Sequence, residues 1–261
     1  MTHVFLSPHL DDASLSCGGT IYQLTQKGER VIILTVTAGD PPKQLPESSI
    51  LADLYARWES GEAPMSKRRL EDVESAKVLG AIAEHEAFLD CIYRQYEGAL
   101  LYPSEESLFN QVSDNDPLIQ LLDKQVSTFT ERFTDTQTLY IPLGVGHHVD
   151  HQLVRDWGLK IYKHHPDLCV KFYEEYPYKR DTSAIEHART DLPSTIKIEA
   201  ELVTLSRFDV TAKIQAVACY KSQISTFWDN VDAMASEIRD MFRSDEDSDT
   251  YVECFWVIQN Q

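Results

Sequence analysis

The fold prediction starts from the sequence VFLSPHLDD at residues 4–12, close to the N-terminus. Its apolar run, Val-Phe-Leu, predicts a short buried strand because a turn-forming Ser-Pro pair follows directly. The segment after the two aspartates has the apolar spacing of a helix. In open α/β sheets, ligands bind outside the carboxyl ends of the strands. We therefore expect His9, Asp11 and Asp12 to belong to a site. The simpler alternative is that one aspartate only caps the helix.

A second apolar run at residues 31–36 completes a strand–helix–strand unit, the pattern of a parallel sheet. Further strands are predicted at residues 86–89, 139–143, 169–173, 195–203 and 251–258. Helices are predicted at residues 13–26, 51–59, 67–80, 118–133, 148–163, 210–220 and 227–243. Loops are predicted at residues 41–50, 61–66, 92–116 and 244–249, and the long loop 92–116 is expected to form a wall of the site. The fold class is therefore α/β, with residues 1–261 forming one Rossmann-like domain that has a mostly parallel sheet and helices on both faces.

Composition narrows the classes of function. The 261 residues are 43% hydrophobic and carry a formal net charge of −18. Because so acidic a surface repels phosphate backbones, nucleic-acid binding is not expected. No stretch has the length and apolarity of a membrane span, and no signal peptide is recognised. Five widely spread cysteines without a CxxC pair favour reduced thiols in the cytoplasm.

A second polar motif, GHHVDH at residues 146–151, follows the predicted strand at 139–143. It is expected to open on the same edge of the sheet as His9. Two histidines and one carboxylate, with a position left for water, are the ligands of a hydrolytic zinc site. The spacing does not decide which two histidines bind the metal, because His147 and His151, and equally His148 and His151, would share a helix face. A solvated helix start is the alternative for an isolated pair, but the matching N-terminal motif favours a metal site.

The two motifs resemble those of the PIG-L/LmbE-like zinc-dependent deacetylase family, Pro-His-x-Asp-Asp near the N-terminus and His-x-Asp-His about halfway along the chain. Three further segments agree with the family, namely the small residues 16–20, an Arg-x-x-Glu helix from Arg68 to Gly80, and a late Lys-x-x-Ala…Ser-Gln segment from Lys213 to Gln223. The resemblance covers residues 4–223 and is most specific in the ordered pair of motifs. It implies an LmbE-like fold.

The resemblance also implies a metal site. Its zinc ligands would be His9, Asp12 and His151, and Fe²⁺ also accepts two histidines and a carboxylate. His147 has no family role. Cys17, although near in sequence, is expected to pack in the helix rather than bind metal.

The remaining roles are also carried over from the family. Asp11 would be the general base, His148 would stabilise or protonate the tetrahedral intermediate, and Asp150 would orient His148. Arg68 would contact the substrate, and a salt bridge to Glu71 or a surface charge is the alternative. The family usually has Glu after the aspartate pair, whereas this chain has Ala13. That departure puts the substrate in doubt more than hydrolysis.

The implied activity is zinc-dependent N-deacetylation of an N-acyl amino sugar or its conjugate, such as an N-acetylglucosaminyl conjugate, a small-molecule partner. Zinc-activated water would attack the amide while Asp11 removes its proton. A thiol–sugar conjugate or glycosylated natural product is the alternative substrate. Its sugar could stack on an aromatic platform, although the same tyrosines could equally be ordinary surface and core residues: Tyr93, Tyr96, Tyr102, Tyr176 and Tyr178. A metal- or sugar-binding protein without catalysis is the third hypothesis. A dinucleotide-binding dehydrogenase is disfavoured because the first turn lacks GxGxxG. A homo-oligomer is compatible with the sequence.

Overall fold

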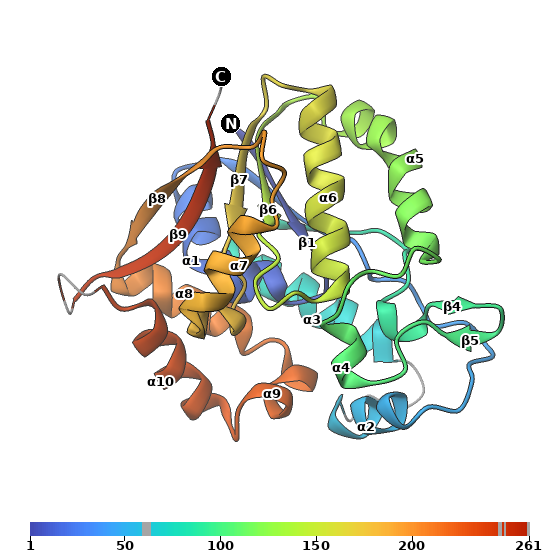
Figure 1. Cartoon of the computed structure of the whole chain (residues 1–261). Coiled ribbons are helices and arrows are strands. Elements are labelled where there is room, and N and C mark those ends of the chain that lie inside the picture. The colour runs from blue at the N-terminus through green and yellow to red at the C-terminus, as the bar shows by residue number, and fades with distance from the viewer. Residues whose placement is uncertain (59–63, 245–246, 248, 260–261) are drawn as a thin grey trace.

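The computed structural model describes residues 1–58, 64–244, 247 and 249–259. Within these residues the main sheet has seven strands in the order β3-β2-β1-β6-β7-β9-β8 (Figure 1). The strands are β1 (Thr2–Ser7), β2 (Arg30–Thr35), β3 (Ile82–His85), β6 (Thr136–Pro142), β7 (Cys169–Tyr173), β8 (Ile198–Leu205) and β9 (Tyr251–Ile258). The first five run parallel, and β9 and β8 add antiparallel pairings at one edge. The predicted mostly parallel sheet is confirmed.

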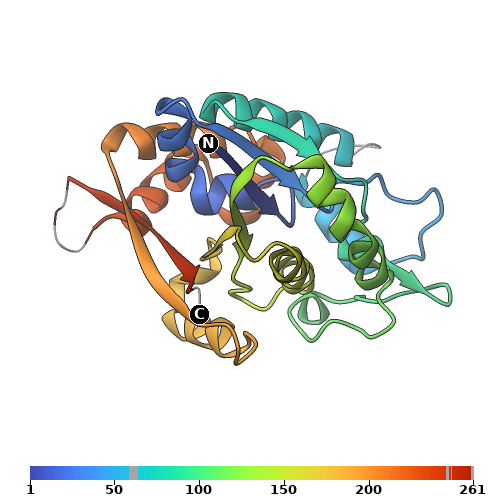
Figure 2. The same cartoon turned by 90° about the horizontal axis from the view of Figure 1, so that it is seen from above.

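Helices cover both faces of the sheet, as predicted (Figure 2). One face carries α1 (Asp12–Gln26), α3 (Pro64–Leu79) and α8 (Arg207–Val217), and the other carries α5 (Pro117–Arg132), α6 (Val149–His164) and α7 (Thr182–Thr190). Around the carboxyl ends of the parallel strands lie α2 (Ser49–Trp58), α4 (Glu105–Leu108), α9 (Lys221–Phe227), α10 (Val231–Phe242) and the hairpin β4 (Gln95–Tyr96) and β5 (Ala99–Leu100) (Figure 1). Single 3₁₀ turns are η1 (Cys91–Tyr93) and η2 (Tyr178–Arg180).

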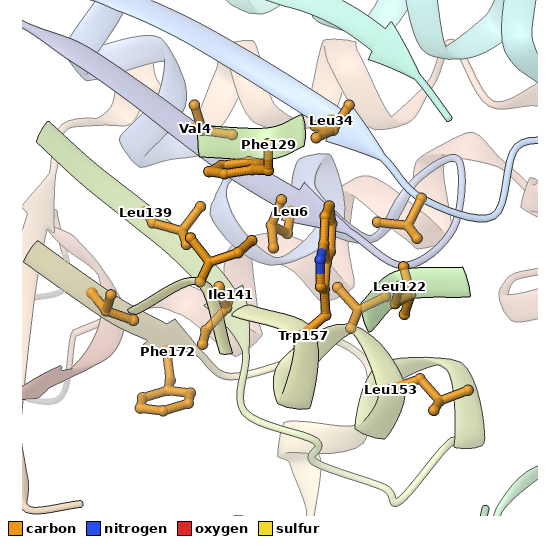
Figure 3. Close-up of a cluster of buried hydrophobic side chains, with 14 of the residues drawn as sticks. Val4, Leu6, Leu34, Leu122, Phe129, Leu139, Ile141, Leu153, Trp157 and Phe172 are labelled. Carbon is orange, nitrogen blue, oxygen red and sulfur yellow. The ribbon is translucent and has the colours of Figure 1, made fainter. Parts of the chain in front are cut away.

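Strand β1 lies at the centre of the fold because both of its faces are buried. Val4 and Leu6 belong to the cluster that packs against Phe129 of α5 and Trp157 of α6 (Figure 3). Phe5 points to the other face and stacks on Tyr140, with ring centroids 3.9 Å apart. A continuous apolar run is typical of such a strand, since alternation disappears when both faces are covered.

Several predicted boundaries are wrong. The third strand lies at Ile82–His85 rather than at 86–89, because it is an edge strand whose half-exposed residues are not uniformly apolar. Strand β8 lies at Ile198–Leu205 rather than at the predicted 195–203. The predicted helix 227–243 begins only at Val231, since Asn230 caps α10 by accepting from the Ala233 N–H at 2.9 Å, and Phe227 is the last residue of α9. Helix α7 lies in a stretch for which no element was predicted.

Other predictions fall partly on residues outside the described ranges. These are the end of the helix at Glu59, the interruption at 61–66 and the acidic loop at 244–249. The predicted loop 92–116 contains the hairpin β4–β5 and α4, and its residues Ile92 and Leu108 line the pocket described below.

A buried ion pair between Lys213 of α8 and Glu253 of β9 lies against the middle of α1. The Lys213 ammonium lies 2.7 Å from the Glu253 carboxylate and also donates to the Ser16 carbonyl, at 3.1 Å. In turn, Glu253 accepts from the backbone N–H groups of Gly19 and Thr20, at 3.0 and 2.8 Å. Burial lowers the pKa of Lys213 to about 8, while Glu253 acts in the opposite direction. The middle of α1 therefore obtains hydrogen-bond partners from α8 and β9.

Candidate active site

The two sequence motifs meet at the carboxyl ends of β1 and β6, which are neighbours in the sheet (Figure 1). The His9 ring centroid is 4.8 Å from that of His148 and 5.3 Å from that of His151. Asp150 is also present, with one carboxylate oxygen 3.0 Å from His9 Nε2. The structure thus brings the predicted residues of both motifs together, because parallel strands open their turns on one edge.

In the first turn, neither aspartate caps α1 with its side chain. Asp11 occupies the N-cap position but makes no side-chain capping hydrogen bond. Instead, Ser7 Oγ accepts from the Ala13 N–H at 3.1 Å. Asp12 Oδ2 accepts from the His9 N–H at 2.7 Å, outside the helix. The capping-only alternative therefore does not describe these carboxylates.

Asp12 is shared between two imidazoles from different elements. Its Oδ2 lies 3.1 Å from His9 Nδ1 and 3.4 Å from His151 Nε2. Burial alone would raise the pKa of Asp12, but His151 and His9 hold it well below the usual value. Asp12 is therefore an anionic oxygen donor between two nitrogen donors.

The second turn uses a histidine as its cap. Gly144, Gly146 and His147 have φ values of 92°, 82° and 63°, a left-handed path that is costly for a residue other than glycine. His148 then caps α6, because its Nδ1 accepts from the Asp150 N–H at 3.3 Å. A neutral imidazole that accepts at Nδ1 carries its proton on Nε2. Burial, together with His9 and His151, holds the pKa of His148 well below its usual value.

Glu175 is a site residue that the sequence prediction missed. Its carboxylate lies 3.2 Å from His151 Nδ1 and accepts from the N–H groups of Gly144 and Val145, at 2.7 and 3.0 Å. With Nδ1 directed at this carboxylate, His151 Nε2 is left as a donor of a lone pair. A signal was available, since Glu175 closely follows the predicted strand 169–173 at the same sheet edge.

Asp150 has partners other than the expected one. Its carboxylate contacts His9 Nε2, accepts from the Cys91 N–H at 3.0 Å and pairs with Arg94 at 2.5 Å. The contact with His148 is made by the Asp150 backbone N–H instead. The geometry therefore differs from the expectation that the carboxylate orients His148. Arg94, also missed, is buried and pairs with Asp116 at 2.9 Å as well.

Asp11 faces Arg68 from α3. The closest guanidinium nitrogen lies 3.6 Å from Asp11 Oδ2, and the guanidinium carbon lies 4.8 Å from the centroid of the Trp58 ring. Burial raises the pKa of Asp11 to about 6, although Arg68 acts to lower it. The alternative salt bridge from Arg68 to Glu71 is absent from the described contacts, since Glu71 accepts from Ser222 instead.

The side chains at this edge line a cavity of about 120 Å³. Its polar lining is His9, Asp11, Asp12, Arg68, Asp90, His148, Gln223 and Thr226. Of the tyrosines considered above, Tyr176 and Tyr178 also line it, whereas Tyr93 and Tyr102 pack in a core cluster and Tyr96 is exposed.

Ala13 does not line this cavity. It is fully buried in the core cluster that contains Phe5 and Cys17. The alanine therefore removes no carboxylate from the cavity wall of this chain, and Cys17 packs in the helix as expected.

The donor set fits a divalent metal. His9 and His151 each offer a ring nitrogen close to Asp12 Oδ2, which is the oxygen donor. Tetrahedral zinc sites use such sets of two nitrogens and one oxygen. Among the described residues, three groups have donor atoms that all lie close enough to one another to share an ion, and none of them includes Asp12: His9/His148/His151, Cys91/His148/Asp150 and His9/Asp90/Asp150. However, capping leaves the proton of neutral His148 on Nε2, which favours donation over ligation.

Comparisons with known proteins agree with this geometry. The family model PIG-L, described as GlcNAc-PI de-N-acetylase, matches residues 4–162. The chain is 30% identical over 189 residues to the 2'-N-acetylparomamine deacetylase of Niallia circulans, a match that covers 67% of this chain and 66% of that protein. The chain thus spans about two thirds of the length of that relative.

Two solved structures resemble the whole chain. One is the zinc-inhibited form of teicoplanin deacetylase Orf2, with a TM-score of 0.83, 27% identity, and coverage of 100% of this chain and 99% of that one. The other is a deacetylase–teicoplanin complex, with a TM-score of 0.80, 26% identity and full coverage of both chains. Among the described residues, no helix combines the length and apolarity that crossing a bilayer requires. Because the family match contains both turns that form the site, the chain belongs to the PIG-L family of de-N-acetylases.

Proposed function

We propose that the protein is a metal-dependent N-deacetylase that acts on an N-acetyl amino sugar within a glycosylated natural product. The observation that carries the proposal is Asp11, a buried carboxylate that faces the cavity without serving as a cap. A carboxylate with a raised pKa near the imidazole of His9 suits proton transfer during amide hydrolysis. The names of the relatives, for acetylparomamine and teicoplanin, support a glycosylated natural product as the substrate.

The residues proposed to hold the metal are His9, Asp12 and His151. Their donor atoms surround one Asp12 oxygen, and Glu175 leaves His151 Nε2 available. A bound divalent ion supplies Lewis acidity, which polarises a carbonyl and makes water more acidic. Zn²⁺ and Fe²⁺ both suit this set, and a relative with a zinc-inhibited form makes the choice of metal a question for experiment.

The other side chains supply proton transfer and positioning. Asp11 accepts a proton from water as the water oxygen bonds to the amide carbon. The Nε2–H of neutral His148 donates to the carbonyl oxygen as that oxygen becomes negative. When the C–N bond breaks, Asp11 returns the proton to the leaving nitrogen, which gives acetate and a free amine. Arg68 binds an oxygen of the substrate, held ready by its stacking over Trp58.

We infer that the deacetylase domain extends over residues 1–261, beyond the segment that the family model matches. Tyr178, Gln223 and Phe227 support this, because all three line the cavity and follow residue 162. A cytoplasmic location remains a prediction. A homo-oligomer remains a prediction.

The test combines metal analysis with a substrate panel. The purified protein is loaded separately with Zn²⁺ and Fe²⁺ and incubated with 2'-N-acetylparomamine, teicoplanin and N-acetylglucosamine glycosides. We expect release of acetate and a free amine in equal amounts from at least one of them. Metal binding without release from any N-acetyl sugar would favour a binding protein. Failure to take up either metal would overturn the assignment of His9, Asp12 and His151.

A further inference from the structure

Tyr178 is a cavity residue to which the proposed chemistry assigns no role. It is the first residue of η2 and closely follows Glu175, which contacts His151 at the same edge of the sheet. Its side chain lines the cavity together with Asp11 and His148. The described residues offer no hydrogen-bond partner for the Tyr178 hydroxyl, whereas a buried tyrosine hydroxyl normally has one. This hydroxyl is therefore available to a bound substrate.

The ring of Tyr178 lies against the glycine turn that leads to His148. A Cβ atom on Gly146 would come within 2.6 Å of Tyr178 Cγ, so the ring occupies the space that a side chain at position 146 would need. The Glu175 carboxylate fastens the same segment to the turn, because it accepts from two backbone N–H groups there. Tyr178 and His148 are thus held at one turn by segments that are far apart in the sequence.

A single phenylalanine packs against both of these side chains. The ring of Phe109 meets His148 edge-on, with centroids 5.3 Å apart, and meets Tyr178 in the same way, with centroids 5.7 Å apart. Tyr178 also meets the ring of His151 edge-on, at 6.0 Å. Tyr178 therefore lies on the side of the cavity that carries His148 and a proposed metal ligand, which is where the amide oxygen of the substrate is proposed to bind.

The surroundings keep the Tyr178 hydroxyl protonated. Burial raises the pKa of this hydroxyl, and the negative charges of Asp12 and Asp11 raise it further, because a phenolate near two carboxylates is unfavourable. A neutral hydroxyl donates more strongly to an oxygen that becomes negative than to the oxygen of a neutral amide. Tyr178 is therefore suited to stabilise developing charge.

We propose that Tyr178 is a second hydrogen-bond donor to the amide oxygen, acting beside His148 while the tetrahedral intermediate forms. This inference rests on the proposed deacetylase function and adds a catalytic residue to it. Sites that stabilise an oxyanion use hydrogen-bond donors that are fixed in place before the reaction, and tyrosine is among the side chains that serve. The alternative is that Tyr178 forms a platform for the sugar, which would need the ring and not the hydroxyl.

The first measurement uses Tyr178→Phe, which removes the hydroxyl and keeps the ring. The substrate is the N-acetyl sugar from which the metal-loaded wild-type enzyme releases amine fastest. We expect kcat to fall by about 10²-fold, with KM nearly unchanged, because the lost contact strengthens only in the transition state. The matched control is Tyr96→Phe, whose hydroxyl belongs to a residue that is 45% exposed and outside the cavity lining. A wild-type kcat for Tyr178→Phe would overturn the inference.

The second measurement compares two inhibitors of the same variant. One is the methylphosphonamidate of the same amino sugar, which carries a tetrahedral centre in place of the amide carbon, and the other is the free amine product. For Tyr178→Phe we expect the Ki of the phosphonamidate to rise by the factor by which kcat/KM falls, with the Ki of the amine unchanged. A merely structural role would weaken both inhibitors, and that result would refute the assignment.

Two further results separate the hydroxyl from the ring. Tyr178→Leu removes both, so an active Tyr178→Phe together with an inactive Tyr178→Leu would show that Tyr178 is a platform. A crystal structure of the wild-type enzyme with the phosphonamidate needs no variant to fold. We expect the Tyr178 hydroxyl within hydrogen-bond distance of a phosphoryl oxygen, and a hydroxyl directed elsewhere would contradict the proposal.

The two proposals fail in different ways. If the wild-type enzyme releases no amine from any N-acetyl sugar, the deacetylase proposal fails. If it releases amine and Tyr178→Phe is equally fast, only the role of Tyr178 fails. Circular dichroism and metal content of both Tyr178 variants and of the Tyr96→Phe control verify that a lower kcat does not come from unfolding or metal loss.

Discussion

The two turns that form the site use opposite means to begin a helix. In the turn from β1 to α1, Ser7 accepts the capping hydrogen bond, so Asp11 and Asp12 remain available for other partners. In the turn from β6 to α6, His148, the proposed hydrogen-bond donor to the substrate, is itself the cap. Capping by a neighbour leaves charged groups free, whereas capping by an imidazole selects its tautomer. Similar backbone connections therefore give one turn proton-accepting groups and the other a hydrogen-bond donor.

The largest expected effect in the second turn is from His151→Ala. We expect the variant to lose its metal and its activity to fall to background, because one of three proposed ligands is removed. Metal content by mass spectrometry and amine release measure both. His147→Ala, in the same turn, is the control and should retain the metal. Metal retained by His151→Ala would show that the histidine is not a ligand.

In the first turn, Asp11→Asn removes the proposed base without changing its shape. We expect kcat to fall by about 10²–10⁴-fold, the range for general bases. Metal content should stay near the wild-type value, since Asp11 is not one of the three proposed ligands. Near-wild-type turnover would contradict the assigned role.

The two functions of His148 can be separated by two substitutions. His148→Ser and His148→Ala both remove the Nε2–H donor, and we expect each to lower kcat by about 10²–10³-fold. Serine is a good helix cap and alanine is not, so the alanine variant should be less stable than the serine variant by about 1 kcal/mol. Kinetics and urea unfolding measure the two effects. Equal stability of both variants would count against the capping role.

The smallest effect tests the first cap. Ser7→Ala removes the acceptor for the Ala13 N–H, and we expect a loss of about 0.5–2 kcal/mol in the free energy of unfolding. Urea denaturation with constant m-value is the measurement. If Ser7→Ala has no effect while Asp11→Ala is destabilising, Asp11 rather than Ser7 caps α1 in solution, and the contrast between the turns disappears.

The sequence predicted the meeting of the two motifs because parallel strands open their turns at one edge. That rule needs only the order of strands and the residues that follow them. It also applies to Glu175 after β7, which could have been found in this way. Arg94 carried no such signal, since an arginine in a long polar segment is expected on the surface. Only packing reveals that it is buried against Asp150 and Asp116.

Errors in the predicted elements have a local physical origin. Strand β3 lies at the edge of the sheet and is only partly buried, so it tolerates polar residues such as Glu84 and His85. An apolar run therefore could not reveal its position in the sequence. In the segment 227–243, the predicted helix starts too early, because the apolar residues before Asn230 lie outside the helix whose start Asn230 sets by capping α10. Ala13 was read as a change at the substrate, but its side chain points into the core. The direction in which a side chain points is set by the folded backbone, so the sequence alone does not reveal it.

The ion pair between Lys213 and Glu253 has a consequence for the order of assembly. Helix α1 carries Asp11 and Asp12 near its start, yet the N–H groups of Gly19 and Thr20 obtain their partner from β9, which follows every other strand in the chain. During synthesis, the N-terminal strand–helix unit leaves the ribosome first. The contacts of Gly19 and Thr20 with Glu253 can form only after β9 has also emerged. We therefore expect the contacts that join α1 to β9, close to the proposed site, to form only after nearly the whole chain has been made.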